Sequence, residues 1–125
     1  MIELMMTVAI VAILAAVAIP AYTQHTTKAK RAAAESFIMG VANKQEQYIL
    51  DARTYAATLT LLGITTPSDV SSHYNIGIAV GLTPPTYTIT ATPIGSQLAN
   101  DTLCGSVSIT QAGVKSASTG ASNCW

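Results

Sequence analysis

Residues 4–22 read LMMTVAIVAILAAVAIPAY, a run of 19 residues without a charge. As a helix this run is about 28 Å long at about 1.5 Å per residue, close to the hydrocarbon thickness of a bilayer. The stretch therefore predicts a membrane-spanning helix. A cleaved signal peptide fits less well, because the charge ahead of the run is the acidic Glu3 and not a basic residue. A buried helix of a soluble domain would need a larger protein around it.

Charge is scarce and unevenly distributed along the chain. Six basic and six acidic residues give no net charge, and charged residues make up 10% of the 125 residues, against about 25% in an ordinary soluble domain. Eight of these charges fall in residues 23–53, whereas residues 54–125 carry three charges and 22 serines or threonines. Zero net charge excludes the broad attraction of a generic nucleic-acid binder, and the apolar composition excludes a disordered tail. We therefore divide this single-domain length into three segments, 1–22, 23–53 and 54–125.

The second segment, residues 23–53, predicts a continuation of the helix with one apolar face. Its apolar residues recur at offsets of three, four and seven, which is the period of a helix face. The apolar stripe comprises Ala34, Phe37, Ile38, Val41, Tyr48, Ile49 and Ala52, and the opposite face carries Lys30, Arg31, Glu35, Lys44, Glu46, Asp51 and Arg53. Pro20 lacks an amide hydrogen and is expected to bend or locally unwind the helix. We expect one long interrupted helix to about Arg53, exposed at first and then packed on a domain.

The third segment, residues 54–125, predicts a small antiparallel sheet. Apolar and polar residues alternate over 74–80, 86–92 and 106–110, and residues 114–116 can form a fourth short strand. In the second of these stretches Tyr87, Ile89 and Ala91 would face the helix. A sheet of three or four strands laid on the second half of the helix, an α+β fold, would bury both apolar faces.

The two cysteines, Cys104 and Cys124, close the end of this hydroxyl-rich segment. An even pair of this kind is typical of a disulfide formed in an oxidising compartment, and two free thiols are the alternative. Lys28, Lys30 and Arg31 follow the span, and the positive-inside rule would place them and the rest of the chain in the cytoplasm, which is a reducing compartment. A basic leader ahead of residue 1 would remove this conflict.

The first segment resembles the N-terminal segment of type IV pilins. The resemblance is carried by IELM at residues 2–5, by VAIVAILAAVAIPAY at residues 8–22, and by their position at the amino end. In that family a short basic leader is removed before an N-methylated Phe, which is followed by Thr, Leu, Ile and Glu. Glu3 matches the family's assembly glutamate, and Pro20 matches the proline that kinks the helix. Met1 stands where the family has Leu, so we expect the start to be truncated or assigned late, and the methylated residue is not assigned.

The resemblance extends over nearly the whole chain to the short type IVa pilins, including a minor-pilin group close to competence pilins. It is carried further by RTYA at 53–56, TYTITATP at 86–93, DTLCG at 101–105 and CW at 124–125. It implies a type IV pilin fold whose cysteines bound a C-terminal disulfide loop exposed on the fibre. It also implies an extracellular filament subunit, held in the inner membrane before assembly with its globular domain on the periplasmic side.

The function that these observations predict is a structural subunit that polymerises through its N-terminal helix into a filament for adhesion, twitching motility or DNA uptake. The partners expected are other copies of the chain, the inner membrane, the pilus assembly machinery and minor pilins. Glu3 would set the register by pairing with the amino terminus of an adjacent subunit, as the resemblance implies. The residues expected to pack in the fibre core are Leu4, Ile10, Ile13, Leu14 and Ile19. The alternatives are a minor pilin that primes or decorates the pilus, including a DNA-binding competence pilin, and a type II secretion pseudopilin, which the terminal cysteine loop disfavours.

Catalysis and cofactors find no support in the sequence. We find no serine with a suitable histidine and acid, and no glycine-rich phosphate loop, and therefore expect no enzymatic activity and no cofactor. His25 and His73 lack partners at metal-ligand spacing, so no metal site is expected. Lys28, Lys30 and Arg31 have no interleaved aromatic residues on which bases could stack, and DNA is expected to bind weakly if at all.

Overall fold

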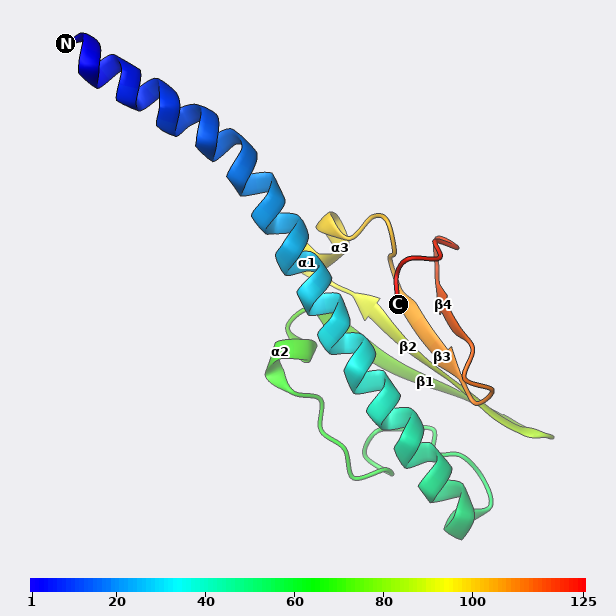
Figure 1. Ribbon diagram of the computed structural model, residues 1–125. Coiled ribbons are helices and arrows are strands. Elements are labelled where there is room, and N and C mark those ends of the chain that lie inside the picture. Colours follow the sequence, from blue (N-terminus) through cyan, green and yellow to red (C-terminus); the bar gives the residue numbers. More distant parts are fainter.

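One long helix projects from a small α+β domain in the computed structural model, which describes all 125 residues (Figure 1). Helix α1 spans Ile2–Ala52 and carries the first two sequence segments without a break, running through Pro20. Its projecting half and its domain half run in slightly different directions. The helix ends at Arg53, whose left-handed conformation (φ 58°) lets its amide donate to the Ile49 carbonyl.

Four strands form one antiparallel sheet, as the alternating pattern predicted. The strands are β1 (Tyr74–Leu82), β2 (Pro85–Pro93), β3 (Val107–Thr110) and β4 (Lys115–Ala117), and they lie in the order β1-β2-β3-β4. Ile89 of β2 is paired with Ile78 on one side and with Ile109 on the other, which places apolar residues in line across the three strands. The expected fold class is confirmed.

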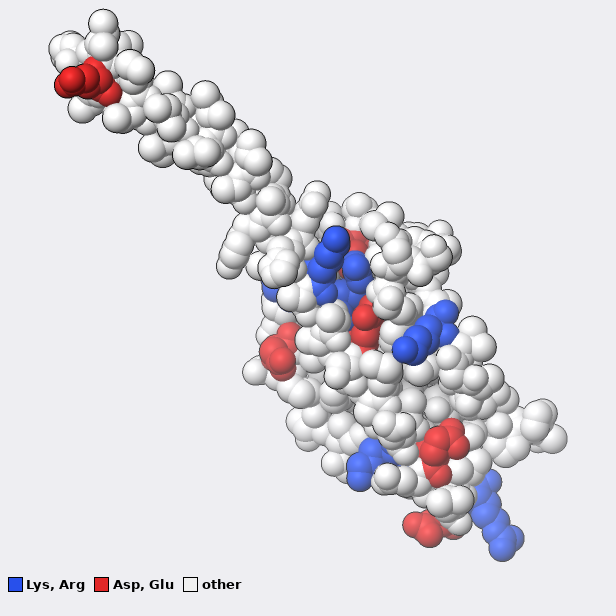
Figure 2. All heavy atoms as spheres, viewed as in Figure 1, with Lys and Arg blue, Asp and Glu red and all other residues white.

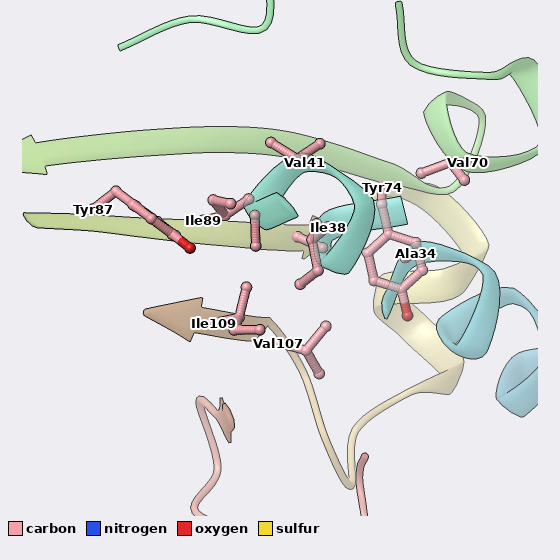
Figure 3. Packing of buried hydrophobic residues seen from close by; sticks show 11 residues of the cluster. Ala34, Ile38, Val41, Val70, Tyr74, Tyr87, Ile89, Val107 and Ile109 are labelled. Atoms are coloured by element: carbon pink, nitrogen blue, oxygen red, sulfur yellow. The ribbon is translucent and has the colours of Figure 1, made fainter. Parts of the chain in front are cut away.

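The core lies between the second half of α1 and one face of the sheet (Figure 3). Tyr87, Ile89 and Ala91 point toward the helix and are at most 3% exposed, which confirms the inward face predicted for this strand. The helix contributes Ala34, Ile38 and Val41, and β3 contributes Val107 and Ile109. Because all the buried apolar residues of α1 fall between residues 34 and 42, the domain is built on the second half of the helix alone.

Two short helices were not predicted from the sequence. Helix α2 (Ser68–Ser71) supplies Val70 to the core, and α3 (Gly95–Asn100) buries Gln97. The connector that follows α1 is fastened by Gln45, whose Nε2 donates to the Ala56 carbonyl at 2.7 Å while its Oε1 accepts from the Ala56 amide at 2.8 Å. These contacts hold the polypeptide close to α1 although its sequence lacks a strong period.

Candidate functional site

The projecting half of α1 presents a continuous apolar surface that contacts nothing else in the chain. An 18-residue window of this helix, near the N-terminus, is apolar and long enough to cross a membrane and is not buried at all. The first buried residue of the helix is Thr27. The five residues expected to pack in a fibre core are all more than half exposed, at Leu4, Ile10, Ile13, Leu14 and Ile19. So large an apolar surface needs lipid or another protein to cover it.

Glu3 is the single charged residue on this projecting half. Figure 2 shows acidic atoms at the tip of the projecting helix and no basic side chain near them. It lies in the first turn of α1, and the carboxylate forms no ion pair within the chain. The Thr7 hydroxyl of the same stretch donates to the Leu4 carbonyl at 2.8 Å. Glu3 is therefore the one charged side chain on this surface, and it would require a cation if water is removed.

A buried ion pair fastens the base of the projecting helix to the domain. Arg31 Nη1 donates to Asp101 Oδ1 at 2.6 Å, and the two side chains are 9% and 2% exposed. Asp101 Oδ2 accepts from the Tyr74 hydroxyl at 3.3 Å. Gln97 Nε2 donates to the Tyr74 oxygen at 2.8 Å and to the Thr27 carbonyl at 3.0 Å. Burial raises the pKa of Tyr74 to about 12, so its hydroxyl keeps the proton that it donates to Asp101.

The position of Arg31 and Glu35 corrects the simple picture of a charged helix face in solvent. Both were predicted to face solvent on the side opposite the apolar stripe, yet they are only 7% and 9% exposed and share the buried face of α1 with Ala34 and Ile38. The segment after α3 covers this face, because Asp101 is brought against Arg31 from 70 residues away. Lys44 and Glu46, farther along the helix, are exposed as predicted.

Glu35 is the buried carboxylate of this group that is least well compensated. Its Oε1 makes no hydrogen bond, and the nearest cation, Arg31 Nε, is 3.6 Å away. Burial raises the pKa of the Glu35 carboxyl, and the charge of Asp101 adds to that effect, while Arg31 and Lys115 oppose it. The carboxylate form is therefore less favourable here than in water.

Glu35→Gln is expected to remove one source of pH dependence from the stability of the chain. The folded-state pKa of Glu35 lies above its ordinary value of 4.5, so the folded chain holds the proton more tightly than the unfolded chain. The stabilising contribution is present below that ordinary value and is lost as the pH rises through the folded-state pKa. Denaturant unfolding of both chains in detergent micelles across this interval should show the wild type losing stability relative to Glu35→Gln. A difference that does not change with pH would contradict the assignment.

The C-terminal loop is closed by the disulfide between Cys104 and Cys124, which are both buried and have Cα atoms 5.7 Å apart. The loop carries β4, and its end is held by Trp125, whose Nε1 donates to the Ser116 carbonyl at 3.0 Å. Lys115 Nζ lies 5.1 Å from the centre of the Trp125 ring, within the range of a cation–π contact. The disulfide therefore holds a thin sheet edge against the domain.

Replacing both cysteines, as Cys104→Ser with Cys124→Ser, is expected to lower the free energy of unfolding by about 3 kcal/mol, the chain-entropy value for a loop of this size. The 20-residue separation of the two cysteines sets that value. Denaturant unfolding of the two chains in the same detergent measures it. Equal unfolding midpoints would show that the disulfide does not stabilise the domain.

On the face shown in Figure 2 the remaining charges form no continuous basic strip. The ion pairs of the chain involve only Arg31, Glu35 and Asp101, so the other basic side chains are unpaired. No group of three histidine, cysteine, aspartate or glutamate side chains is placed to hold a metal ion. The site residues that sequence reasoning missed are Gln45, Gln97 and Asp101, whose partners lie between 11 and 70 residues away.

Comparison with known proteins places this geometry in context. The family described as "Type IV minor pilin ComP, DNA uptake sequence receptor" matches residues 20–108. A fimbrial protein of Neisseria meningitidis serogroup B strain MC58 is 36% identical over 74 residues, covering 59% of this chain and 44% of that protein. A fimbrial protein of serogroup A strain Z2491 is 32% identical over 101 residues, covering 81% and 57%. The chain thus spans about half the length of these curated relatives.

The fold is also found among solved structures. A type IV pilin from Shewanella oneidensis superposes with a TM-score of 0.60 and covers 79% of this chain and 97% of that one. The two are 19% identical, so this likeness concerns the fold alone.

Proposed function

Because this chain belongs to the type IV pilins, in the family described as type IV minor pilin ComP, we propose that it is a subunit of a type IV pilus. In this proposal it is held in the inner membrane by the projecting half of α1 and then polymerises through that half into an extracellular filament. The observation that carries the proposal is the fully exposed apolar window of α1 beside a compact domain. Adhesion, twitching motility and DNA uptake are the roles that such a filament can serve.

The first step of the mechanism is a change of solvent for the apolar helix. Lipid tails are as apolar as leucine, so within the membrane the hydrophobic effect does not favour helix association. Outside the membrane, water would contact the surface that includes Leu4, Ile10 and Ile19, and burial against other copies becomes strongly favourable. Extraction and polymerisation are therefore coupled, and the assembly machinery has to move the helix directly from lipid into the growing bundle.

The second step is the choice of register. Alanine and valine recur along the helix, so many axial positions pack almost equally well. A buried Glu3 carboxylate must find a cation, because an unpaired buried charge is costly. Pairing with the amino terminus of an adjacent subunit, as in the family, would satisfy Glu3 in only one stagger. Packing would then supply affinity, and Glu3 would supply register.

Electron microscopy of filaments from the cells that carry this gene, with mass spectrometry of the purified filaments, tests the proposal. We expect the chain to be present in the filaments, and its abundance there separates a main subunit from a minor one. Filaments that contain none of this chain would overturn the proposal.

A DNA-contacting minor pilin is the second candidate function, favoured by the matching family, which is described as a DNA uptake sequence receptor. The charge distribution limits how such a pilin could bind. Beyond Arg53 the only basic residue is Lys115, which is already engaged with Trp125. The exposed cations at Lys28 and Lys44 lie at different points of α1 and do not follow one groove.

Duplex DNA is therefore expected to bind the full chain weakly and to dissociate as salt rises to the physiological range. Few phosphate contacts release few counterions, so the total binding energy is small and mostly electrostatic. Titration of a fluorescent duplex with the chain in detergent micelles, at low and at physiological salt, measures this. Tight binding at physiological salt would overturn the expectation and favour the receptor role.

A further inference from the structure

Opposite, unpaired charges lie near the two ends of the globular domain. Where α1 enters the domain, the exposed Lys28 borders a polar cleft of about 280 Å³ between the helix and the segment after α3. Arg31 and Asp101 also line this cleft, but they compensate each other. Figure 2 shows a group of basic side chains where the projecting helix meets the domain. Lys28 forms no ion pair and is the free charge of the cleft.

The far end of the domain carries Asp51 in an unusual position. It lies in the last turn of α1, which holds no basic residue, and its side chain is exposed. The carbonyl end of a helix is its negative pole, where a carboxylate is disfavoured and a cation is favoured. Lys44 lines the same shallow hollow as Asp51, and Arg53 follows two residues later, yet neither forms an ion pair with Asp51. The isolated chain therefore leaves an acidic group where a base from elsewhere would be stabilising.

The distance between these two groups matches the length of the domain. Lys28 and Asp51 are 23 residues apart on one unbroken helix, which is about 35 Å at 1.5 Å per residue. The part of α1 within the domain, from Thr27 to Ala52, is about 39 Å long on the same measure. If the apolar halves of two copies pack side by side in one parallel bundle, their domains must be displaced along it. A displacement of about one domain length brings Lys28 of one copy beside Asp51 of another.

We propose that the Lys28 cleft of one copy receives Asp51 of the next copy along the same line of the filament. This inference rests on the proposed function, because it requires parallel copies that share one bundle. The contact is head-to-tail, and it repeats without closing, as a filament requires. It also pairs a free cation with a free anion of each subunit, so that a chain of zero net charge gains attraction at every repeat.

Carbodiimide cross-linking, which condenses a lysine amine with a carboxylate in direct contact, tests the pair. Filaments treated with the reagent and digested should yield a peptide that joins Lys28 to Asp51, and dispersed chains in detergent should not. The link cannot form within one copy, because the two residues are far apart on the same helix. Filaments that contain the chain and are cross-linked at other sites, but never at this pair, would overturn the inference.

Charge exchange provides a second measurement on the full chain. Lys28→Glu and Asp51→Lys should each lower filament yield by at least roughly tenfold, since like charges would then face each other. Combining Lys28→Glu with Asp51→Lys should restore most of the yield. Combining Lys28→Glu with Asp69→Lys, which gives the same net charge through an exposed residue of α2, should not.

The outcomes separate this inference from the proposed function. Wild-type filaments that contain the chain, together with normal yields from both single variants, would overturn the pairing and leave the pilus role standing. Equal yields from the two double variants would also overturn it. Filaments without the chain would overturn both. Circular dichroism of each variant in detergent confirms that a lost yield does not reflect a lost fold.

Discussion

Glu3→Ala is expected to lower filament yield by at least roughly tenfold, because a buried carboxylate and its cation contribute strongly only when both are present. The folded chain should still accumulate in the membrane. Removing a charge from the projecting helix makes that helix more apolar, which favours insertion. The domain should not change, since Glu3 lies more than 20 residues before the first buried residue of α1.

Two further variants isolate the charge as the cause. Glu3→Gln keeps the size and polarity of the side chain and should assemble about as poorly as Glu3→Ala. Thr7→Val changes a neighbouring polar residue whose hydroxyl is already bonded to the Leu4 carbonyl, and it should assemble almost normally. Filament counts by electron microscopy and chain levels by immunoblotting give the two readouts. Normal filament numbers with Glu3→Ala would remove the register argument.

Asp101→Ala is expected to lower the free energy of unfolding by about 3–5 kcal/mol, the range for breaking a buried ion pair on one side. The variant leaves the Arg31 guanidinium buried, because the side chain is 9% exposed. The carboxylate that remains near it is that of Glu35, 3.6 Å from Arg31 Nε. Tyr74 also loses the acceptor of its hydroxyl. Denaturant unfolding of the full chain in detergent micelles, followed by tyrosine fluorescence, measures the loss.

Asp69→Ala is the matched control for that experiment. Asp69 is exposed on α2 and forms no ion pair, so its removal should change the free energy of unfolding by less than about 0.5 kcal/mol. If Asp101→Ala were no more destabilising than this control, the buried network would not contribute to the stability of the domain.

The fold was largely predictable because its elements depend on periods within the sequence. Apolar residues at helical spacing predicted α1 to about Arg53, and the alternation around Ile89 predicted the inward face of β2, and both are observed. The helices α2 and α3 were missed, since segments of 4 and 6 residues are too short to show a period. The three-segment division and the kink at Pro20 stay predictions; α1 runs without a break across the first boundary, between residues 22 and 23, and ends at Ala52, next to the second.

The candidate site was predictable only where a residue is unusual in its own neighbourhood. Glu3 is such a residue, a lone acid in an apolar stretch. Arg31 is not, because a basic residue after an apolar helix is usually solvated, and its burial depends on Asp101 70 residues later. No local pattern carries that information, because the contact arises from the way α3 turns the chain back onto α1. The roles assigned to Glu3 and the fibre-core residues stay predictions.

The claim at the centre of this account is that the exposed half of α1 becomes the core of a filament, with Glu3 setting the stagger. A cryo-electron microscopy map of filaments containing this chain, resolved well enough to trace side chains, tests it most directly. The account predicts residues 2–22 of neighbouring copies bundled along the axis, with the Glu3 carboxylate against a cation of an adjacent subunit. A map in which these helices lie apart from one another, or in which Glu3 faces water, would contradict it.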